Sequence, residues 1–168
     1  MRRRKFLASL GGGVTVASSG CLGSEVVHDV TRSVRIDPND GWWWEVENIG
    51  GSAEVGYTVR SEVHTFQVFY FTDPGEFQQY QTYVAGQEPE RQPRGHDGLR
   101  MTAVPDADGI YEAQRPIDGA RLDIDIENTH YFVVDYSNYD QNLDVQHYDD
   151  TLVASVDLTV VDAGIGPF

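Results

Sequence analysis

The sequence predicts an all-β fold, an antiparallel sandwich of two sheets with one short helix, and three observations support this prediction. Apolar and polar residues alternate with a period of two in several segments, as they do in strands that bury one face. Clusters of Gly, Pro, Asn and Asp separate these segments and are typical of turns. Successive segments are spaced by roughly 8–12 residues, the spacing found in antiparallel sandwiches.

The alternating segments predict half-buried strands, each with one solvated face. In the clearest of them, Val55, Tyr57 and Val59 alternate with polar neighbours such as Thr58 and Arg60. Since side chains of a strand point to opposite faces in turn, the apolar set reaches the core and the polar set faces water. The same pattern predicts strands in residues 30–36, 122–126 and 152–160.

Three other segments are more evenly apolar, namely residues 42–46, 66–71 and 131–134. Because a strand that is covered on both faces has no need of polar positions, we place these segments centrally in the sheets. The turn signals that separate the strands lie at residues 37–41, 50–52, 106–109 and 118–119.

One short helix is expected in the middle of the chain. Asp73 can cap it, with Pro74 at the first helical position. Tyr80 and other aromatic residues follow at helical spacing, and Gly86 ends the helix. Residues 87–98, which are rich in proline and charged side chains, are predicted to form an exposed loop.

The chain is strongly acidic, with 27 acidic and 12 basic residues. Four of the basic residues lie at positions 2–5, so the chain from Cys21 onward has eight arginines, no lysine and a net charge of −19 (8 − 27). This composition resembles that of proteins from salt-loving archaea. Such a charge weakens a compact fold in dilute buffer, whereas in molar salt the Debye length is only about 3 Å. It also disfavours binding to nucleic acid, which requires basic side chains on phosphates.

The N-terminal segment resembles an export signal. Arg3 and Arg4, followed by one residue and then Phe6 and Leu7, are similar to the twin-arginine motif. The next stretch is only mildly apolar and contains three consecutive glycines. At about 1.5 Å per residue it is too short to cross a bilayer as a helix. We therefore expect residues 1–20 to be a twin-arginine signal peptide.

The residues Ser-Ser-Gly-Cys that end at Cys21 resemble a lipobox, in which the cysteine becomes the lipid-modified first residue of the mature chain. The resemblance implies lipid attachment at Cys21, and a buried structural thiol is the alternative. A diether lipid of the archaeal kind would supply two chains, which suffice for a stable anchor. We expect residues 21–27 to form a lipidated spacer, on the extracellular face of the cell membrane.

The rest of the chain is predicted to be a β-sandwich domain over residues 28–163, with a C-terminal tail at 164–168. From Val30 to Val161 its layout is similar to the GOLD-like sandwich modules of archaeal surface proteins. The most suggestive stretch is residues 131–138, a late strand that leads into a polar turn. This resemblance implies a non-catalytic module for contact with a protein or a ligand, and an immunoglobulin-like sandwich is the alternative fold.

The sequence contains no arrangement that predicts catalysis, a metal or a cofactor. No serine lies in a GxSxG turn, and the single cysteine is assigned to lipid. His64 and His130 are expected to be partly buried core residues, and neither has a second histidine at zinc-ligand spacing. Glu45 and Glu47 are expected to project outward, whereas a glycosidase acid needs a desolvated carboxyl group. We predict that the protein is not an enzyme.

Two acidic segments concentrate oxygen donors of the kind that Ca²⁺ prefers. The first consists of Asp140, Asp144, His147, Asp149 and Asp150, and the second of Asp106 and Asp108. In a chain this acidic, a solvated surface explains both segments without a metal ion.

The run Trp42, Trp43 and Trp44 is the most distinctive feature of the body of the chain. In a strand, Trp42 and Trp44 share the core face with Val46, while Trp43 shares the opposite face with Glu45. Trp43 is then either covered by a neighbouring loop, which we favour, or exposed as a contact for a sugar ring or a partner.

These observations predict a lipid-anchored, non-catalytic binding or structural module at the surface of a halophilic archaeon. Its partners would be the membrane, through the lipid anchor, and a protein or sugar at the cell surface. The alternative is a Ca²⁺-dependent carbohydrate-binding domain or a small surface hydrolase that uses Trp43 and the loop carboxylates.

Overall fold

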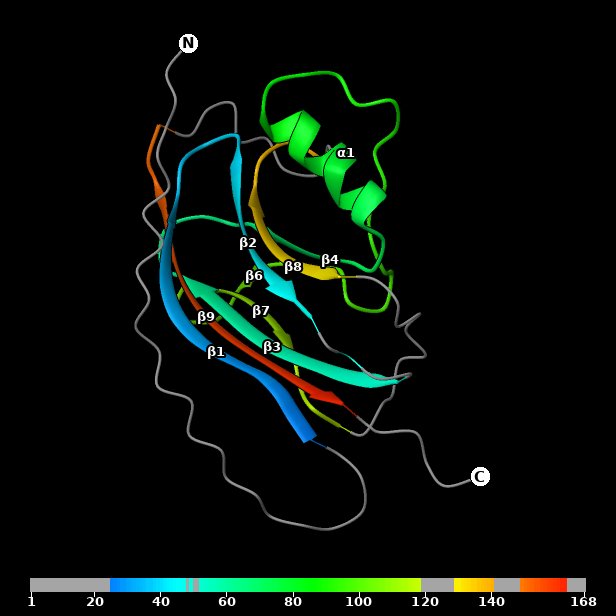
Figure 1. Ribbon diagram of the computed structural model, residues 1–168. Coiled ribbons are helices and arrows are strands. Elements are labelled where there is room, and N and C mark those ends of the chain that lie inside the picture. Colours follow the sequence, from blue (N-terminus) through cyan, green and yellow to red (C-terminus); the bar gives the residue numbers. More distant parts are fainter. Residues whose placement is uncertain (1–24, 48, 50–51, 119–128, 141–148, 163–168) are drawn as a thin grey trace.

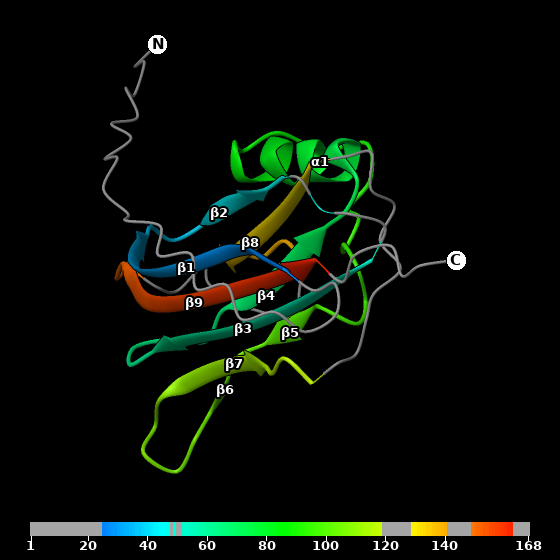
Figure 2. The same cartoon turned by 60° about the horizontal axis from the view of Figure 1, so that its bottom comes forward.

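The computed structural model describes residues 25–47, 49, 52–118, 129–140 and 149–162, whose strands form two antiparallel sheets packed face to face (Figure 1). One helix lies on the outer side of one sheet, which makes three layers (Figure 2). This confirms the predicted all-β sandwich with a short helix. The elements are β1 (Glu25–Ile36), β2 (Asp40–Val46), β3 (Ala53–Ser61), β4 (Gln67–Phe71), α1 (Pro74–Val84), β5 (Met101–Thr102), β6 (Val104–Pro105), β7 (Tyr111–Arg115), β8 (His130–Tyr136) and β9 (Leu152–Asp162).

The five-stranded sheet has the order β1-β9-β3-β7-β6 and the four-stranded sheet the order β2-β8-β4-β5. Every neighbouring pair of strands is antiparallel. The chain changes sheets repeatedly, and two of these crossings, between β1 and β2 and at Ala103 between β5 and β6, connect edge strands of the two sheets. These crossings join the two sheets at their edges, as is usual in sandwiches.

The main core lies between the sheets and follows the predicted alternation. Along β9, every second residue from Leu152 to Val160 is fully buried, and the residues between them face outward. On β3, Val55, Tyr57 and Val59 are buried in the same way. Each such side chain contributes roughly 1.5–3 kcal/mol when it leaves water, so this alternation is the main source of the stability of the sandwich.

A second apolar cluster lies on the outer face of the four-stranded sheet, under α1. It consists of Phe69, Phe71, Phe77, Tyr80, Val133 and Tyr139. Because both faces of this sheet are covered, its strands need no polar alternation, which accounts for the evenly apolar segments of the sequence.

The three evenly apolar segments were predicted to be central strands, and two of them are. β4 and β8 are central strands, as predicted, but β2 lies at the edge of its sheet. The prediction for β2 was wrong because apolar residues on both faces of a strand indicate only that both faces are covered. They do not indicate that the strand is hydrogen-bonded to another strand on each side. In β2, the main core covers one face and α1 the other.

The helix begins and ends where the sequence predicts. The side chain of Asp73 accepts a hydrogen bond of 2.6 Å from the N–H of Gly75, and Pro74 is the first helical residue. After the helix, the N–H of Gly86 donates a bond of 2.8 Å to the carbonyl oxygen of Tyr83. Gly86 has a φ of 76°, a left-handed conformation typical of the residue that follows a helix.

Some predicted segments fall outside the described residues. These are the signal peptide and Cys21, the strand at residues 122–126 and the C-terminal tail. β1 begins at Glu25, so it includes three residues that the sequence analysis assigned to the spacer.

Candidate functional site

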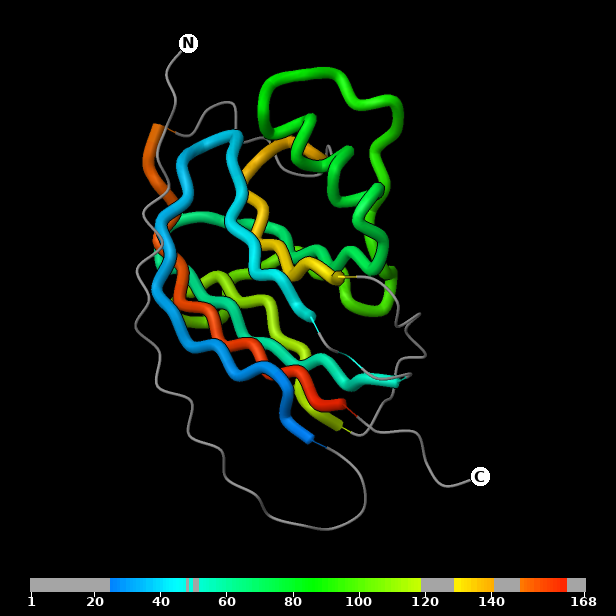
Figure 3. The backbone as a smooth tube through the Cα atoms, viewed as in Figure 1, coloured from blue at the N-terminus to red at the C-terminus, as the bar shows by residue number. Residues whose placement is uncertain are grey.

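The part of the molecule that departs most from a plain sandwich lies over the outer face of the four-stranded sheet. It consists of α1 and residues 85–98, which we call the cover. Figure 2 shows α1 above β2 and β8, and Figure 3 follows the chain from α1 through the loop towards β5. Loops as long as residues 85–98 that lack regular secondary structure are uncommon and often have a function.

Phe77 attaches the first half of α1 to the sheet. Its ring stacks on that of Tyr131 of β8, with centroids 3.8 Å apart and planes inclined by 9°. The indole ring of Trp43 on β2 meets Phe77 edge to face at 5.5 Å. Trp43, the candidate ligand contact of the sequence analysis, is therefore half-buried beside a helix rather than under a loop.

Tyr80 attaches the second half of α1 and is fully buried. A Cβ atom added to Gly41 of β2 would lie 1.8 Å from the Tyr80 hydroxyl oxygen, so a residue with a side chain leaves no room for that hydroxyl. The hydroxyl donates a hydrogen bond of 2.8 Å to Oδ1 of Asp135. Asp135 is paired directly with Gly41 across β8 and β2. The side chain of Tyr80, a residue of the cover, thus donates a hydrogen bond to a carboxyl group in the protein interior.

Asp135 is completely buried, and its two carboxyl oxygens have different surroundings. Oδ1 accepts the bond from Tyr80 and a second bond of 2.7 Å from the Ser137 hydroxyl. Oδ2 has no hydrogen-bond partner in the described part of the chain. Burial raises the pKa of Asp135 to about 7; hydrogen bonds from Ser137 and Tyr80 oppose this rise, and the negative charge of Asp140 adds to it.

Two more polar contacts join the cover to residues 135–140, which we call the junction segment. The guanidinium Nε of Arg94 lies 2.7 Å from Oδ1 of Asp140. The hydroxyl of Tyr139 donates a bond of 2.6 Å to the carbonyl oxygen of Pro93. Together with the Tyr80 contact, they hold both the helix and the loop of the cover to six consecutive residues.

The cover has a shallow depression of about 440 Å³, lined by Tyr83 and residues 87–92. The Tyr83 ring packs edge to face on Tyr139 at 5.2 Å. The N–H of Glu90 donates a bond of 2.9 Å to Oε1 of Gln79. Both walls of the depression are therefore attached to α1 or to the junction segment. One aromatic ring among amide and carboxylate groups suits a polar ligand better than an apolar one.

The first acidic segment is only partly within the described residues. Asp140 is buried and paired with Arg94, whereas Asp149 and Asp150 are exposed. Asp144 and His147 lie outside the described residues. In the ranges that the structure describes, no three His, Cys, Asp or Glu side chains come together in a way that could hold a metal ion.

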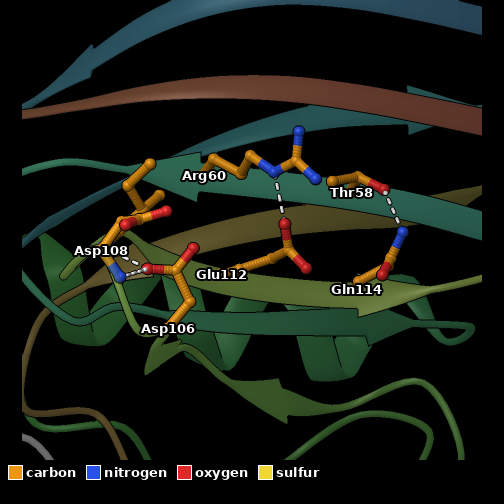
Figure 4. Close-up of polar contacts among 7 residues, drawn as sticks. Thr58, Arg60, Asp106, Asp108, Glu112 and Gln114 are labelled. Atoms are coloured by element: carbon orange, nitrogen blue, oxygen red, sulfur yellow. Dashed lines mark hydrogen bonds and ion pairs between the residues drawn. The ribbon is translucent and has the colours of Figure 1, made fainter.

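The second acidic segment forms the turn between β6 and β7, at the edge of the five-stranded sheet (Figure 4). Asp106 Oδ1 accepts bonds of 2.8 and 2.9 Å from the N–H groups of Asp108 and Ile110. Beside it, Arg60 of β3 forms an ion pair with Glu112 of β7. The outer face of this sheet is the solvated polar surface that the alternating pattern predicts.

Both histidines lie mainly in the interior, as expected, but only His130 lies in a strand, since His64 lies in the connection between β3 and β4. His130 is fully buried, and its Nδ1 lies 3.3 Å from the hydroxyl of Tyr70. The His64 side chain is 20% exposed and stacks on Tyr136 with centroids 6.0 Å apart. Glu45 and Glu47 are exposed, also as expected.

The remaining predicted site residues, Arg3, Arg4, Phe6, Leu7 and Cys21, lie outside the described residues. The described helix is not long and apolar enough to span a membrane. No protein-family model matches the chain, and a search of curated proteins finds no significant relative.

The contact between Tyr80 and Asp135 was not predicted from the sequence. One signal for it was present, because Asp135 is the only charged residue of an otherwise apolar segment, residues 131–136. A charged residue in a strand that is covered on both faces must be paired, hydrogen-bonded or neutral. Its partner could not be predicted, since Tyr80 lies 55 residues away along the chain.

Proposed function

We propose that the protein is a lipid-anchored, non-catalytic binding module on the extracellular face of the membrane of a salt-loving archaeal cell. The motif at Arg3 and Arg4 and the lipobox that ends at Cys21 support the location. The net charge of −19 after the signal and the absence of lysine there support adaptation to salt. The resemblance of residues 131–138 to a GOLD-like module supports a role in binding.

The observation that carries this proposal is the position of the depression relative to the start of β1, which follows Cys21 closely in the sequence. β1 begins four residues after Cys21, a distance of at most about 14 Å in extended chain. Glu25 pairs with Asp162, and His28 Nε2 lies 2.9 Å from the carbonyl oxygen of Glu47. The start of β1 and the ends of β2 and β9 therefore lie at one end of the sandwich.

The depression lies at the other end. α1 packs first over Tyr131, which is paired with Glu45 near the end of β2, and then over Gly41 near the start of β2. It therefore runs away from the end at which β1 begins (Figure 1). Its last turn carries Tyr83, which lines the depression. β1 alone, with 12 residues, spans roughly 40 Å at about 3.3 Å per residue. A lipid on Cys21 would hold the depression outward, where a partner can reach it.

Concentrated salt limits the chemistry of that partner. With a Debye length of about 3 Å in molar salt, attraction between distant charges is lost, and contact depends on stacking and short hydrogen bonds. The Tyr83 ring and the amides of Gln87 and Gln92 offer both. The proposed ligand is therefore a polar group of a cell-surface protein or sugar.

The location is tested by the C21S substitution. The variant chain should appear in the medium, whereas the wild-type chain stays with the membrane fraction and leaves it in detergent. Membrane retention of the C21S protein would contradict the lipid anchor. The T151S variant, which retains a hydroxyl group directly before β9, serves as a control that should stay on the membrane.

The contact surface is tested by a photo-crosslinking amino acid placed at Gln87, in the depression, or at Gln114, an exposed glutamine on the opposite sheet. Illumination of intact cells should give a crosslinked product from position 87 and none from position 114. The opposite result, or equal crosslinking at both positions, would exclude the depression as the contact surface.

A further inference from the structure

The cover is held to the sandwich in two chemically different ways. The first half of α1 is attached by rings, with Phe77 between Tyr131 and Trp43. The second half also has ring contacts, such as those of Tyr80 and Tyr83 with Tyr139, but it and the loop are attached in addition by the polar contacts of the junction segment. Of these polar contacts, the bond from Tyr80 to Asp135 is the most deeply buried. Ring contacts do not respond to protons, whereas a contact to a carboxyl group does.

The surroundings of Asp135 suit a neutral carboxyl group better than a charged one. The two hydroxyl donors, Tyr80 and Ser137, are directed at Oδ1, which is the arrangement expected for the carbonyl oxygen of a carboxylic acid. Oδ2 has no partner in the described residues. Gln67, paired with Asp135 in register on β4, contributes a buried Oε1 that also has no donor there. A charged Oδ2 would thus add a second unpaired acceptor to this site.

The charged groups around Asp135 also oppose its ionisation. The negative charge of Asp140, in the junction segment, raises the pKa of Asp135. Among the described residues, no cation acts on Asp135 itself, and Arg94 is paired with Asp140. The titratable groups that face Asp135 or its partner Tyr80 are Tyr80 and Tyr83 of α1, Asp40 of β2, and Tyr139 and Asp140 of the junction segment.

We propose that Asp135 is a proton-dependent latch, whose protonated form holds the cover on the four-stranded sheet and whose ionised form weakens that attachment. The second half of α1 and the loop would open most readily when the carboxyl group is charged, because opening allows water to solvate it. The proposal concerns the fold itself and does not rest on the proposed partner or on the lipid anchor.

The direction and size of the effect follow from linkage. In the closed form, the pKa of Asp135 is about 7, against an ordinary value of 3.8 for a solvated carboxyl group. Between these two values only the closed form holds the proton, so each unit of rising pH favours opening about tenfold. Above about pH 7 both forms are ionised and the effect ends. The total change is on the order of a thousandfold.

Hydrogen exchange followed by mass spectrometry tests the latch on the full chain, in concentrated salt, between about pH 4 and pH 8. After correction for intrinsic exchange, protection of the α1 amides should fall about tenfold per pH unit and then level near pH 7. The amides of β9, in the main core, should stay more protected than α1 at every pH. Equal protection of both elements would mean that the cover opens only on global unfolding, which would overturn the proposal.

Two variants separate the latch from general destabilisation. D135N retains an acceptor for Tyr80 and Ser137 but cannot ionise, so α1 should become protected independently of pH. Y80F removes one donor to the carboxyl group but keeps the charge, so its pH dependence should persist and extend to a higher pH. If D135N retains the wild-type slope, or if Y80F abolishes it, the proposal fails. Y80F keeps the test decisive if D135N does not fold.

Discussion

The hydroxyl group of Tyr80 occupies the space that a side chain at Gly41 would fill, and from there it reaches the buried carboxyl group of Asp135. The helix and the edge strand are thus fitted to each other at a single position. A residue without a side chain on β2 and a long polar side chain on α1 are both needed for this contact.

The first prediction concerns Gly41. In G41A, the added methyl group would lie 1.8 Å from the Tyr80 oxygen, so Tyr80 must withdraw from Asp135. We expect a loss of about 1–3 kcal/mol in the free energy of unfolding, measured by denaturant titration in concentrated salt. G98A is the matched control, since its new methyl group would lie 3.3 Å or more from the flexible His96 ring. A loss in G98A equal to that in G41A would contradict this explanation.

The second prediction concerns the pH dependence of global stability. The folded-state pKa of Asp135 is raised to about 7, so the folded state retains a proton that the unfolded state releases near 3.8. The contribution of Asp135 to stability is therefore present at low pH and is lost as the pH rises to about 7. The loss amounts to about 4 kcal/mol at most.

The difference between wild type and D135N isolates this contribution, because the two proteins share every other carboxyl group. D135N should be the more stable protein at pH 7, and its advantage should vanish towards pH 4. D157N removes an exposed acid on β9, and its stability relative to wild type should not change with pH in this way. Denaturant titrations at a series of pH values provide the measurement.

The sandwich could be predicted from the sequence because it depends on a local signal. The alternation along β3 and β9 is visible in a few consecutive residues, and the capping residue Asp73 and Gly86 mark the helix by local rules alone. The position of the helix has no such signal. That α1 lies on the outer face of the four-stranded sheet depends on contacts between Phe77 and residues far along the chain.

The surroundings of the tryptophan run also depend on contacts with residues far along the chain, so they could be predicted only in part. Trp42 and Trp44 pack against the main core, as their parity predicts, and Trp43 has the opposite orientation. What lies against Trp43 could not be inferred, since an outward-facing ring has the same sequence pattern under a helix, under a loop or in water. The edge position of β2 was misjudged for a related reason, because α1 covers it from above.

The third prediction concerns Phe77, which is 4% exposed and lies between Tyr131 and Trp43. F77A should remove the ring stack and leave a cavity, at a cost of about 3–5 kcal/mol in unfolding free energy if the cover stays closed. If the cover detaches, the cost is smaller, and Trp43 becomes solvated, with fluorescence shifted to the red. V104A, at a residue that is 63% exposed, should change neither quantity.

The fourth prediction concerns salt and separates surface charge from the buried carboxyl group. With a net charge of −19 after Cys21, repulsion between exposed acids should lower the melting temperature in dilute buffer, and added KCl should raise it steeply. The double variant D29N/D157N removes two exposed acids from β1 and β9 and should reduce this salt dependence. D135N should leave the salt dependence almost unchanged, because salt does not penetrate to a completely buried group. Equal reductions in the two variants would show that the charge of Asp135 is exposed to solvent, contrary to the closed arrangement of Tyr80 over the sheet.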